Sequence, residues 1–317
     1  MTPMPPRRPR SLRRLMILAA VSLLALTAGC STLSKVVKLP GKVVHRIRGN
    51  DSDLSKIVAF TPFFDTTFVR DRGIAADFEK RIIEQFRKQC AKTIILTPDD
   101  PEFPPDLRRL PTLASGALDD FTLARTGRRL GLNAIATGGL LNISGDWKEK
   151  GFWWFKDRKP EIKIALLVSI YDTETGSKIL DESLVHAFLV DENDLEAIKA
   201  KNESGILLME DALGEVAKDL TERACERLNE LPWKCYVESA VGDKIVLSAG
   251  SRTGLKPGRK MSVYAQGEVL EGVGGLKYIR RGEKLADIEV TAVGDDRAEA
   301  TLISGEAVRA GDTAIPH

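Results

Sequence analysis

Apolar residues recur every three to four positions along three stretches of the chain, the spacing of amphipathic helices. The first predicted helix has a core stripe formed by Ile74, Phe78, Ile82, Phe86 and Cys90. The second is expected over 118–130, and Gly131 stands where a left-handed residue commonly ends a helix. A third, long helix follows capping residues at 191–194 and ends before Pro232. Its stripe is Met209, Leu213, Val216, Leu220, Ala224 and Leu228.

Five other segments have the composition or the alternation of β-strands. They are 56–63, 93–97, 134–147, 161–171 and 178–190. In the fourth, one face is formed by Ile162, Ile164, Leu166, Val168 and Ile170. Gly138-Gly139 in the third suggests a bulge or a close approach of another backbone. A tight turn, Asp-Thr-Glu-Thr-Gly at 172–176, joins the last two. Three successive strands flanked by helices predict an α+β domain over 54–231, with a mixed sheet packed with helices.

The remainder, 232–317, carries six short strand patterns that glycines separate at regular intervals. They begin at Cys235, Asp243, Met261, Leu285, Ala298 and Asp312. This spacing predicts a small β-barrel. The chain is therefore divided into a signal segment (1–29), a tether (30–53), the α+β domain and the barrel domain.

The 317 residues suffice for about two domains of roughly 150 residues each. A hydrophobic content of 43% and a charged content of 29% are typical of globular proteins. The formal charge of +2 includes five arginines among the first 29 residues, which contain no acid, so the rest carries 2 − 5 = −3. A folded part so close to neutrality gives no electrostatic argument for nucleic-acid binding.

The N-terminus has the pattern of a secretory signal. A basic stretch over 7–14 precedes an apolar run at 15–27, which is too short to span a membrane. The run ends in Leu-Thr-Ala-Gly-Cys30, which resembles a bacterial lipobox and predicts cleavage before Cys30 and acylation of its thiol. Ser31 after the cysteine resembles the pattern of outer-membrane lipoproteins. The alternative is an ordinary signal peptide followed by an incidental cysteine.

The tether carries five basic residues among valines: Lys35, Lys38, Lys42, Arg46 and Arg48. It either lies on anionic lipid headgroups or is a solvated linker.

Two glycine-containing motifs carry a resemblance to a known family. They are Ala124-x-x-x-Gly127-x-x-x-Gly131-Leu-Asn-Ala-Ile-Ala-Thr-Gly138 and Tyr171-Asp-Thr-Glu-Thr-Gly176. They are similar to the CsgG-type (curli-secretion) lipoprotein family, to the N-terminal domain of the Tol-Pal β-propeller protein and to the middle domain of the flagellar assembly T protein. The turn Gly-Ser-Arg-Thr-Gly-Leu-Lys-Pro-Gly at 250–258 is similar to one in the SH3-like C-terminal module of the last protein.

The resemblance implies a CsgG-like α/β sandwich followed by an SH3-like barrel. It also implies an envelope lipoprotein or periplasmic scaffold without known catalytic residues. The channel-forming branch of the family extends its strands into membrane hairpins. Here only about 15 residues, 145–160, join the two middle strands, and we expect a loop there instead of a membrane hairpin.

That expected loop holds three of the four tryptophans and several basic residues. Its centre is Phe152, Trp153, Trp154 and Phe155. Aromatic side chains beside lysines suit a membrane interface or a protein hot spot, so we expect this segment to contact membrane or partner. The alternative is a hydrophobic plug folded onto its own sheet.

Four cysteines are present, and lipidation accounts for Cys30. Cys90 lies on a helix stripe and is expected to be a small buried hydrophobic residue. Cys225 near the end of the long helix and Cys235 just past Pro232 are a possible disulfide. The alternative is that both remain free thiols.

The sequence offers no assembled catalytic constellation. His45, His186 and His317 fall in separate segments, and neither a metal-binding spacing nor a Gly-x-Ser-x-Gly elbow occurs. The acidic pairs at 99–100, 119–120 and 295–296 fall in expected turns or caps. We expect no catalytic residues, no metal and no cofactor other than the covalent lipid on Cys30.

We therefore expect an outer-membrane lipoprotein that faces the periplasm and acts as a non-enzymatic assembly or scaffolding factor of an envelope machine. Its expected partners are the membrane, through the lipid, and either another envelope protein or further copies of itself. One alternative is a component of an oligomeric, CsgG-like secretion channel. A second is an envelope hydrolase.

Overall fold

The computed structural model describes residues 53–67, 73–152, 154–200, 204–272 and 275–317. These residues belong to one compact unit, Gly49–His317. The signal segment, Cys30 and the tether up to residue 52 lie outside the described residues. Among the helices within these ranges, none is both long and apolar enough to cross a membrane.

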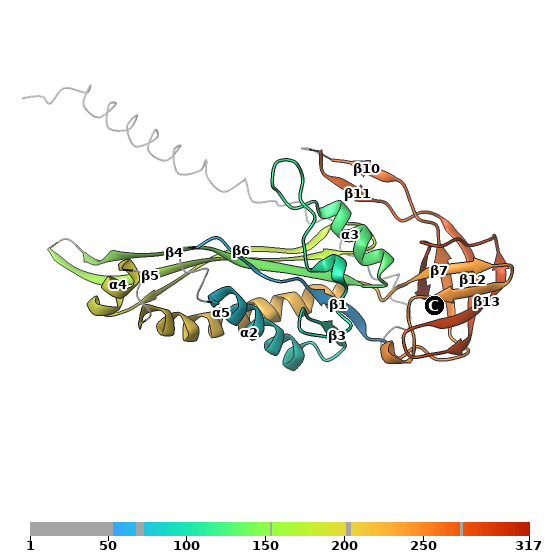
Figure 1. Ribbon diagram of the computed structural model, residues 1–317, viewed down its shortest axis with the longest axis horizontal. Helices are drawn as coiled ribbons and strands as arrows, with labels where there is room; N and C mark the ends of the chain where they lie inside the picture. Colours follow the sequence, from blue (N-terminus) through green and yellow to red (C-terminus); the bar gives the residue numbers. More distant parts are fainter. Residues whose placement is uncertain (1–52, 68–72, 153, 201–203, 273–274) are drawn as a thin grey trace, which may run out of the picture. The chain divides into compact units, whose positions relative to one another are not determined.

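The first part of the described chain is a six-stranded mixed sheet packed with helices (Figure 1). Its strands are β1 (Lys56–Phe60), β2 (Phe64–Asp65), β3 (Thr93–Leu96), β4 (Ala134–Phe152), β5 (Phe155–Asp172) and β6 (Lys178–Leu189). They are ordered β3-β1-β4-β5-β6, with β2 beside β4. The pairs β1–β3, β1–β4 and β2–β4 are parallel, whereas β4–β5 and β5–β6 are antiparallel. The mixed sheet predicted from the sequence is confirmed.

Two helices, α2 (Ile74–Gln89) and α5 (Ser204–Glu230), lie along one face of this sheet (Figure 1). The predicted stripe of α2 is buried there: Ile74, Phe78, Ile82 and Phe86. The alternating face of β5 meets it: Ile162, Ile164, Leu166, Val168 and Ile170 are all buried in the same core. The shorter helix α4 (Glu192–Lys199) precedes α5, and the Asp191 carboxylate accepts a hydrogen bond from the Asp194 backbone N–H as its cap.

The opposite face of the sheet carries α3 (Asp120–Arg129) and a smaller apolar cluster, preceded by the one-turn helix η3 (Pro105–Leu107). Gly127 lets α3 pack closely, since a Cβ there would collide with Thr173 and Ile135. Gly131 follows the helix with a φ of 74°, as its position in the sequence predicts. A Cβ on Gly131 would also lie 2.9 Å from the Ser248 Cβ. Glycine at this position therefore permits both the turn and the contact with the barrel strands.

The glycine pair 138–139 marks a close approach of another backbone. A Cβ on Gly139 would collide with the Phe64 carbonyl of β2, which pairs with β4 there. A register shift follows between Leu140 and Asn142. The expected crowding is confirmed, and the irregularity in pairing falls just after the glycines.

One disulfide joins the two helices on the covered face. It links Cys90 at the end of α2 to Cys225 in α5, with their Cα atoms 5.5 Å apart. The expected Cys225–Cys235 pairing is therefore wrong, and Cys90 is more than a small buried hydrophobic residue. Cys235 is a free thiol in the barrel core, where burial raises its pKa. Ten residues separate Cys225 from Cys235 along the chain, but the two residues belong to different cores.

The second part of the described chain is a closed six-stranded antiparallel barrel. Its strands follow the order β12-β13-β8-β7-β14-β9 around the barrel. They are β7 (Cys235–Val241), β8 (Lys244–Leu247), β9 (Lys260–Tyr264), β12 (Lys284–Val293), β13 (Ala298–Gly305) and β14 (Thr313–Pro316), with the short helix η4 (Ser251–Thr253) after β8. All six predicted strand segments are present. A separate hairpin of β10 (Val269–Glu271) and β11 (Lys277–Ile279) was not predicted.

The barrel also packs against the start of the sheet domain. Leu54 is buried in the barrel core, and the Ser55 backbone N–H donates to the Thr253 carbonyl at 2.8 Å. The indole N–H of Trp233, itself fully buried, donates to the Ser55 carbonyl at 2.9 Å. The residues that lead into β1 therefore contact the barrel before they enter the sheet.

We expect thiol labelling to separate the observed disulfide from the pairing suggested by the sequence. In a Cys30→Ser form of the chain, alkylation after denaturation without reductant should modify Cys235 alone. Reduction should then expose Cys90 and Cys225. Peptide mass spectrometry checks this, and labelling of Cys90 alone before reduction would establish the Cys225–Cys235 pairing instead.

Candidate functional site

The aromatic segment expected as a loop is the paired end of a long hairpin. Strands β4 and β5 continue their antiparallel register through Trp147↔Pro160 to Phe152↔Phe155. Only two residues, 153 and 154, separate these strands along the chain, so the expectation of a loop over 145–160 is wrong. In Figure 1 the ends of these two strands extend past the helices that cover the sheet. The hairpin places Trp154 outside the packed core.

The hairpin tip is exposed where the structure describes it. The Trp154 side chain is 72% exposed, and Trp147 on the same hairpin is 36% exposed. A plug folded onto the sheet is therefore excluded for Trp154. Trp153 and the side chains of Phe152 and Phe155 lie outside what the structure describes, so their role as contact residues stays a prediction.

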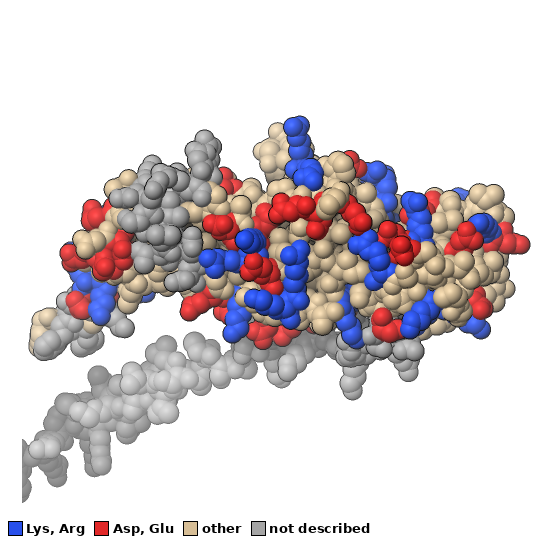
Figure 2. Space-filling model, turned by 60° about the horizontal axis from the view of Figure 1, so that its bottom comes forward, with Lys and Arg blue, Asp and Glu red and all other residues tan. Residues whose placement is uncertain are grey.

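Charged residues line the hairpin in cross-strand pairs. Lys148 contacts Glu161 at 2.5 Å, and Arg158 contacts Glu149 at 3.1 Å. Pairs of this kind stabilise adjacent strands modestly. They place both signs of charge along the strands that lead to the exposed Trp154. On the face of the molecule shown in Figure 2, basic and acidic side chains are likewise interspersed.

A buried cluster of charges lies where the 172–176 turn meets the barrel. Lys234, only 1% exposed, contacts the Asp172 carboxylate and lies 3.5 Å from a Glu174 oxygen. Arg281 donates two hydrogen bonds to Glu174, at 2.6 and 2.7 Å. The sequence identified this segment only as a turn. Because Lys234 and Arg281 lie far from it along the chain, no local pattern could have indicated the cluster.

Mutual pairing keeps all four groups of this cluster charged. Burial alone would raise the pKa of Asp172, but the charge and hydrogen bond of Lys234 hold that pKa below its ordinary value. Burial opposes ionisation of Glu174 in the same way, and Arg281 and Lys234 outweigh it, so its pKa is also lowered. Burial disfavours a charged Lys234, yet the two carboxylates raise its pKa above the ordinary value. The cluster is thus a set of buried ion pairs.

Hydrogen bonds between uncharged groups lie on either side of the cluster. Together with the cluster they form a joint between the sheet and the barrel. The Asn133 side chain accepts from the Ile57 N–H at 2.8 Å and donates to the Lys234 carbonyl at 2.7 Å. The Thr175 carbonyl accepts from the Ile279 N–H of β11 at 2.8 Å. Sheet, turn and barrel are therefore connected by directional bonds that fix their relative geometry.

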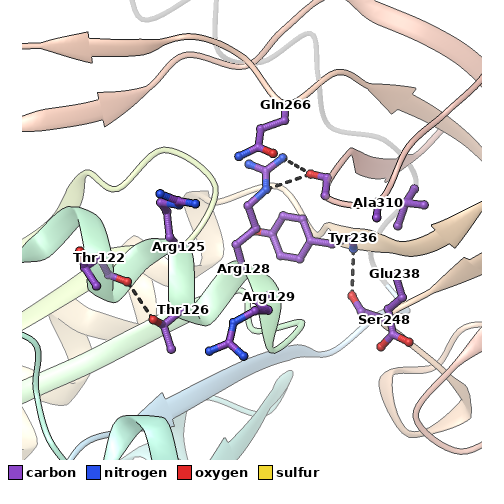
Figure 3. A pocket seen from close by; sticks show the side chains of 12 residues that line it. Thr122, Arg125, Thr126, Arg128, Arg129, Tyr236, Glu238, Ser248, Gln266 and Ala310 are labelled. Carbon is purple, nitrogen blue, oxygen red and sulfur yellow. Dashed lines mark hydrogen bonds between the residues drawn. The ribbon is translucent and has the colours of Figure 1, made fainter.

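A pocket of about 620 Å³ lies beside the joint, between α3 and the barrel (Figure 3). Its helix side presents Arg125, Arg128 and Arg129, and its barrel side presents Tyr236 and Gln266 among others. The Arg128 side chain is 5% exposed, and its guanidinium stacks on the Tyr236 ring at 4.9 Å. The sequence pattern did not indicate any of these residues. The spacing of the three arginines on one helix was the only signal that could have found them.

The remaining candidates from the sequence are not brought together. His186 on β6 stacks with Phe188, whereas His317 after β14 contacts Asp287 at 2.9 Å. Asp119 caps α3 by accepting from the Thr122 N–H, in line with the cap expected there. His45 and Cys30 lie outside the described ranges. Within those ranges, no group of three or more histidine, cysteine or acidic side chains is arranged to hold a metal ion.

Strand β6 forms one edge of the sheet. It pairs with β5 along 11 residue positions, and its other side has no partner strand among the described residues. Val185 and Leu189 are exposed on it, and a shallow hollow beside it is lined in part by His186, Phe188 and Ala212. An unpaired edge with apolar side chains is a surface on which another strand can pair.

Comparison with known proteins gives only distant structural similarity. The sequence matches no protein-family model and no curated protein. Among solved structures, a minor lipoprotein from Acinetobacter baumannii is 10% identical, with 55% of this chain and 94% of that chain covered and a TM-score of 0.29. The PelC dodecamer from Paraburkholderia phytofirmans is 12% identical, with 55% and 92% covered and a TM-score of 0.30. Lipoprotein GNA1162 from Neisseria meningitidis is 9% identical, with 46% and 94% covered and a TM-score of 0.24. Similarity at this level does not transfer a function.

Replacing Lys234 by methionine should be strongly destabilising, because it leaves two buried carboxylates short of a counter-charge. We expect a loss of about 3–5 kcal/mol in the free energy of unfolding, measured by urea denaturation. The matched control is Lys244→Met, which removes an exposed ion pair with Glu299 and should cost less than about 1 kcal/mol. Equal, small losses in both variants would contradict a structural role for the buried cluster.

The same cluster predicts how stability depends on acidity. Because the pKa values of Asp172 and Glu174 are lowered on folding from 3.8 and 4.5, the unfolded chain binds more protons at low pH. Their contribution to stability is present above pH 4.5 and is lost as pH falls through the folded pKa values. Urea titrations should show a steeper acid loss in the wild type than in Asp172→Asn. Identical slopes of the free energy of unfolding against pH in the two proteins would refute the contribution of Asp172 to stability.

Proposed function

We propose that this chain is an outer-membrane-anchored periplasmic lipoprotein that acts as a non-enzymatic assembly or scaffolding factor of an envelope machine. The lipid on Cys30 anchors the chain, and the β4–β5 hairpin contacts membrane or partner. The observation that carries this proposal is the hairpin itself, whose described tip residue Trp154 is 72% exposed. The signal segment and lipobox of the sequence supply the cellular context.

The geometry of the hairpin supports a contact role. An exposed indole at the end of a two-stranded arm is costly to leave in water, and tryptophan is enriched both at membrane interfaces and at protein hot spots. The ion pairs along the strands add modestly to their pairing. A scaffold needs such a surface more than it needs a reactive centre.

A non-enzymatic role is part of the proposal, and the buried cluster supports it. Asp172, Glu174, Lys234 and Arg281 neutralise one another below the surface. Their pairing gives them a structural task and leaves no poised acid or base among them. These four residues provide no observation that favours the envelope-hydrolase alternative.

Replacing Trp153 and Trp154 together by alanine should weaken association without unfolding the protein. We expect the melting temperature to change little, because Trp154 is outside the core, while the share of protein bound to membranes or partner falls. Flotation with outer-membrane vesicles, using Cys30→Ser protein, measures the association. Trp233→Ala is the matched control, since that tryptophan is buried in the barrel and its loss should cost about 3–5 kcal/mol. A large fall in melting temperature with unchanged association would contradict the proposal for the tip.

A second candidate, a component of an oligomeric channel, is favoured by the edge of the sheet. Strand β6 offers 12 residues, Lys178–Leu189, for pairing with another chain. Exposed Val185 and Leu189 would lose contact with water in such a pairing. The unpaired β6 edge therefore supports the alternative, in which copies of the chain would pair along it while the lipid anchor stays the same.

Crosslinking in intact membranes distinguishes the two candidates. The full chain, with its signal, is expressed in a Gram-negative host, and outer membranes are crosslinked before solubilisation. A single crosslinked foreign protein supports the scaffold. A ladder of self-crosslinked copies that disappears in Val185→Lys supports the channel component. Recovery of the chain as unanchored periplasmic protein would overturn the lipidation on which both candidates depend.

A further inference from the structure

The pocket beside the joint has an excess of positive charge. Two arginines, Arg128 and Arg129, follow Arg125 by three and four residues. This spacing places each of them next to Arg125 on the helix surface. Figure 3 shows all three around the space between α3 and the barrel. Arg129 is paired with Asp106 at 2.5 Å. Among the residues that the structure describes, no carboxylate forms an ion pair with Arg125 or Arg128.

Arg128 is held in place by neutral acceptors. Its guanidinium donates to the Gly311 carbonyl, to the Glu174 carbonyl and to the Thr313 hydroxyl. These bonds fix the side chain but do not cancel its charge. In the neighbouring buried cluster the carboxylates of Asp172 and Glu174 are engaged by Lys234 and Arg281. Around the joint there are therefore three cations and two anions. Lys234 and Arg281 pair with the two carboxylates, and Arg128, which lines the pocket, has no anionic partner among the described residues.

The barrel side of the pocket does not supply the missing anion. Glu238 is the acid in the lining, and its carboxylate is paired with Arg297 at 2.6 Å. The remaining barrel side offers the Gln266 amide, the Ser248 hydroxyl and the apolar surfaces of Val237 and Ala310. These groups can contact an organic molecule, while Arg125 and Arg128 are left to bind its charge.

We propose that this pocket binds a phosphate monoester, with the phosphate between Arg125 and Arg128. Arg128 has one N–H donor left after its four hydrogen bonds, and neither guanidinium has a carboxylate partner within the part of the chain that the structure describes. A phosphate monoester carries nearly two negative charges at neutral pH and three acceptor oxygens, which matches two such cations better than a carboxylate does. A volume of about 620 Å³ exceeds what a bare phosphate needs and falls in the range of organic ligand sites. The ester is either a soluble molecule or the headgroup of a lipid. This proposal is independent of the role assigned to the hairpin.

Titration calorimetry on Cys30→Ser protein tests the soluble source, with glycerol phosphate as the probe and succinate as the carboxylate comparison. We expect glycerol phosphate to bind and succinate to bind at least tenfold more weakly. Arg125→Gln should weaken glycerol phosphate binding about tenfold, the loss expected for one charge-assisted contact. Arg125 is exposed and its guanidinium stacks on Phe121 at 5.7 Å, so this variant is expected to fold.

The matched control is Arg108→Gln. Arg108 is also exposed and stacks on a phenylalanine, Phe103, at 5.5 Å, but it does not line the pocket. The Arg108→Gln variant should bind glycerol phosphate with the affinity of the wild type. Arg128→Lys keeps the charge and loses the planar fork, so it should also weaken binding while circular dichroism remains native.

Sedimentation with vesicles tests the lipid source. The protein used carries Trp153→Ala and Trp154→Ala, so that the hairpin does not contribute to vesicle binding. Binding to phosphatidic acid vesicles, lost in Arg125→Gln and absent with phosphatidylcholine alone, assigns the ester to a lipid. Binding of glycerol phosphate but not of vesicles assigns it to a soluble molecule. Failure of both probes, equal affinity for succinate, or equal weakening in Arg108→Gln would overturn the proposal.

Discussion

Lys234 is buried against two carboxylates where the barrel meets the sheet, and the geometry of both parts depends on that contact. Removing an ammonium group and two carboxylates from water costs several kcal/mol for each ion, and only close pairing offsets this cost. Asp172, Glu174 and Arg281 supply that pairing through contacts with defined directions. A joint made of buried charges tolerates little displacement, because each shift leaves an ion short of its partner.

The buried ion pairs also fix the positions of other parts of the molecule relative to one another. The pocket has one side on α3 and the other on the barrel, so it exists only while the joint holds. The contacts of Leu54 and Ser55 with the barrel connect the entry of β1 to the same region. On the sheet side, the Cys90–Cys225 disulfide joins the two helices that cover one face of the sheet. The exposed hairpin tip is thus carried by a body whose internal arrangement is fixed.

Much of the fold could be predicted from the sequence because its elements bury one face. The α2 stripe and the alternating face of β5 each follow the period of their element, and the six barrel strands lie between glycines. The outer halves of β4 and β5 could not be predicted in this way. The described side chains over 146–159 are exposed, so this part of the hairpin has no buried face to impose an alternation, and residues 145–160 were expected to form a loop.

The features that were missed depend on residues far apart in the sequence. Cys90 and Cys225 are separated by 135 positions, and the proximity of Cys235 to Cys225 along the chain suggested the wrong pair. Lys234 and Arg281 meet the 172–176 turn only after the barrel has docked. The anionic character proposed for a pocket ligand likewise depends on which arginines lack a carboxylate partner in the folded chain, and their positions in the sequence do not show this.

Because the buried cluster joins the sheet to the barrel, the two parts should unfold together. Hydrogen exchange read by mass spectrometry along a urea series measures this most directly, with the amides of β5 and β7 followed separately. Both strands should lose protection at the same urea concentration in the wild type, and at different urea concentrations in Lys234→Met. Loss of protection in β7 while β5 stays protected, in the wild type, would contradict it.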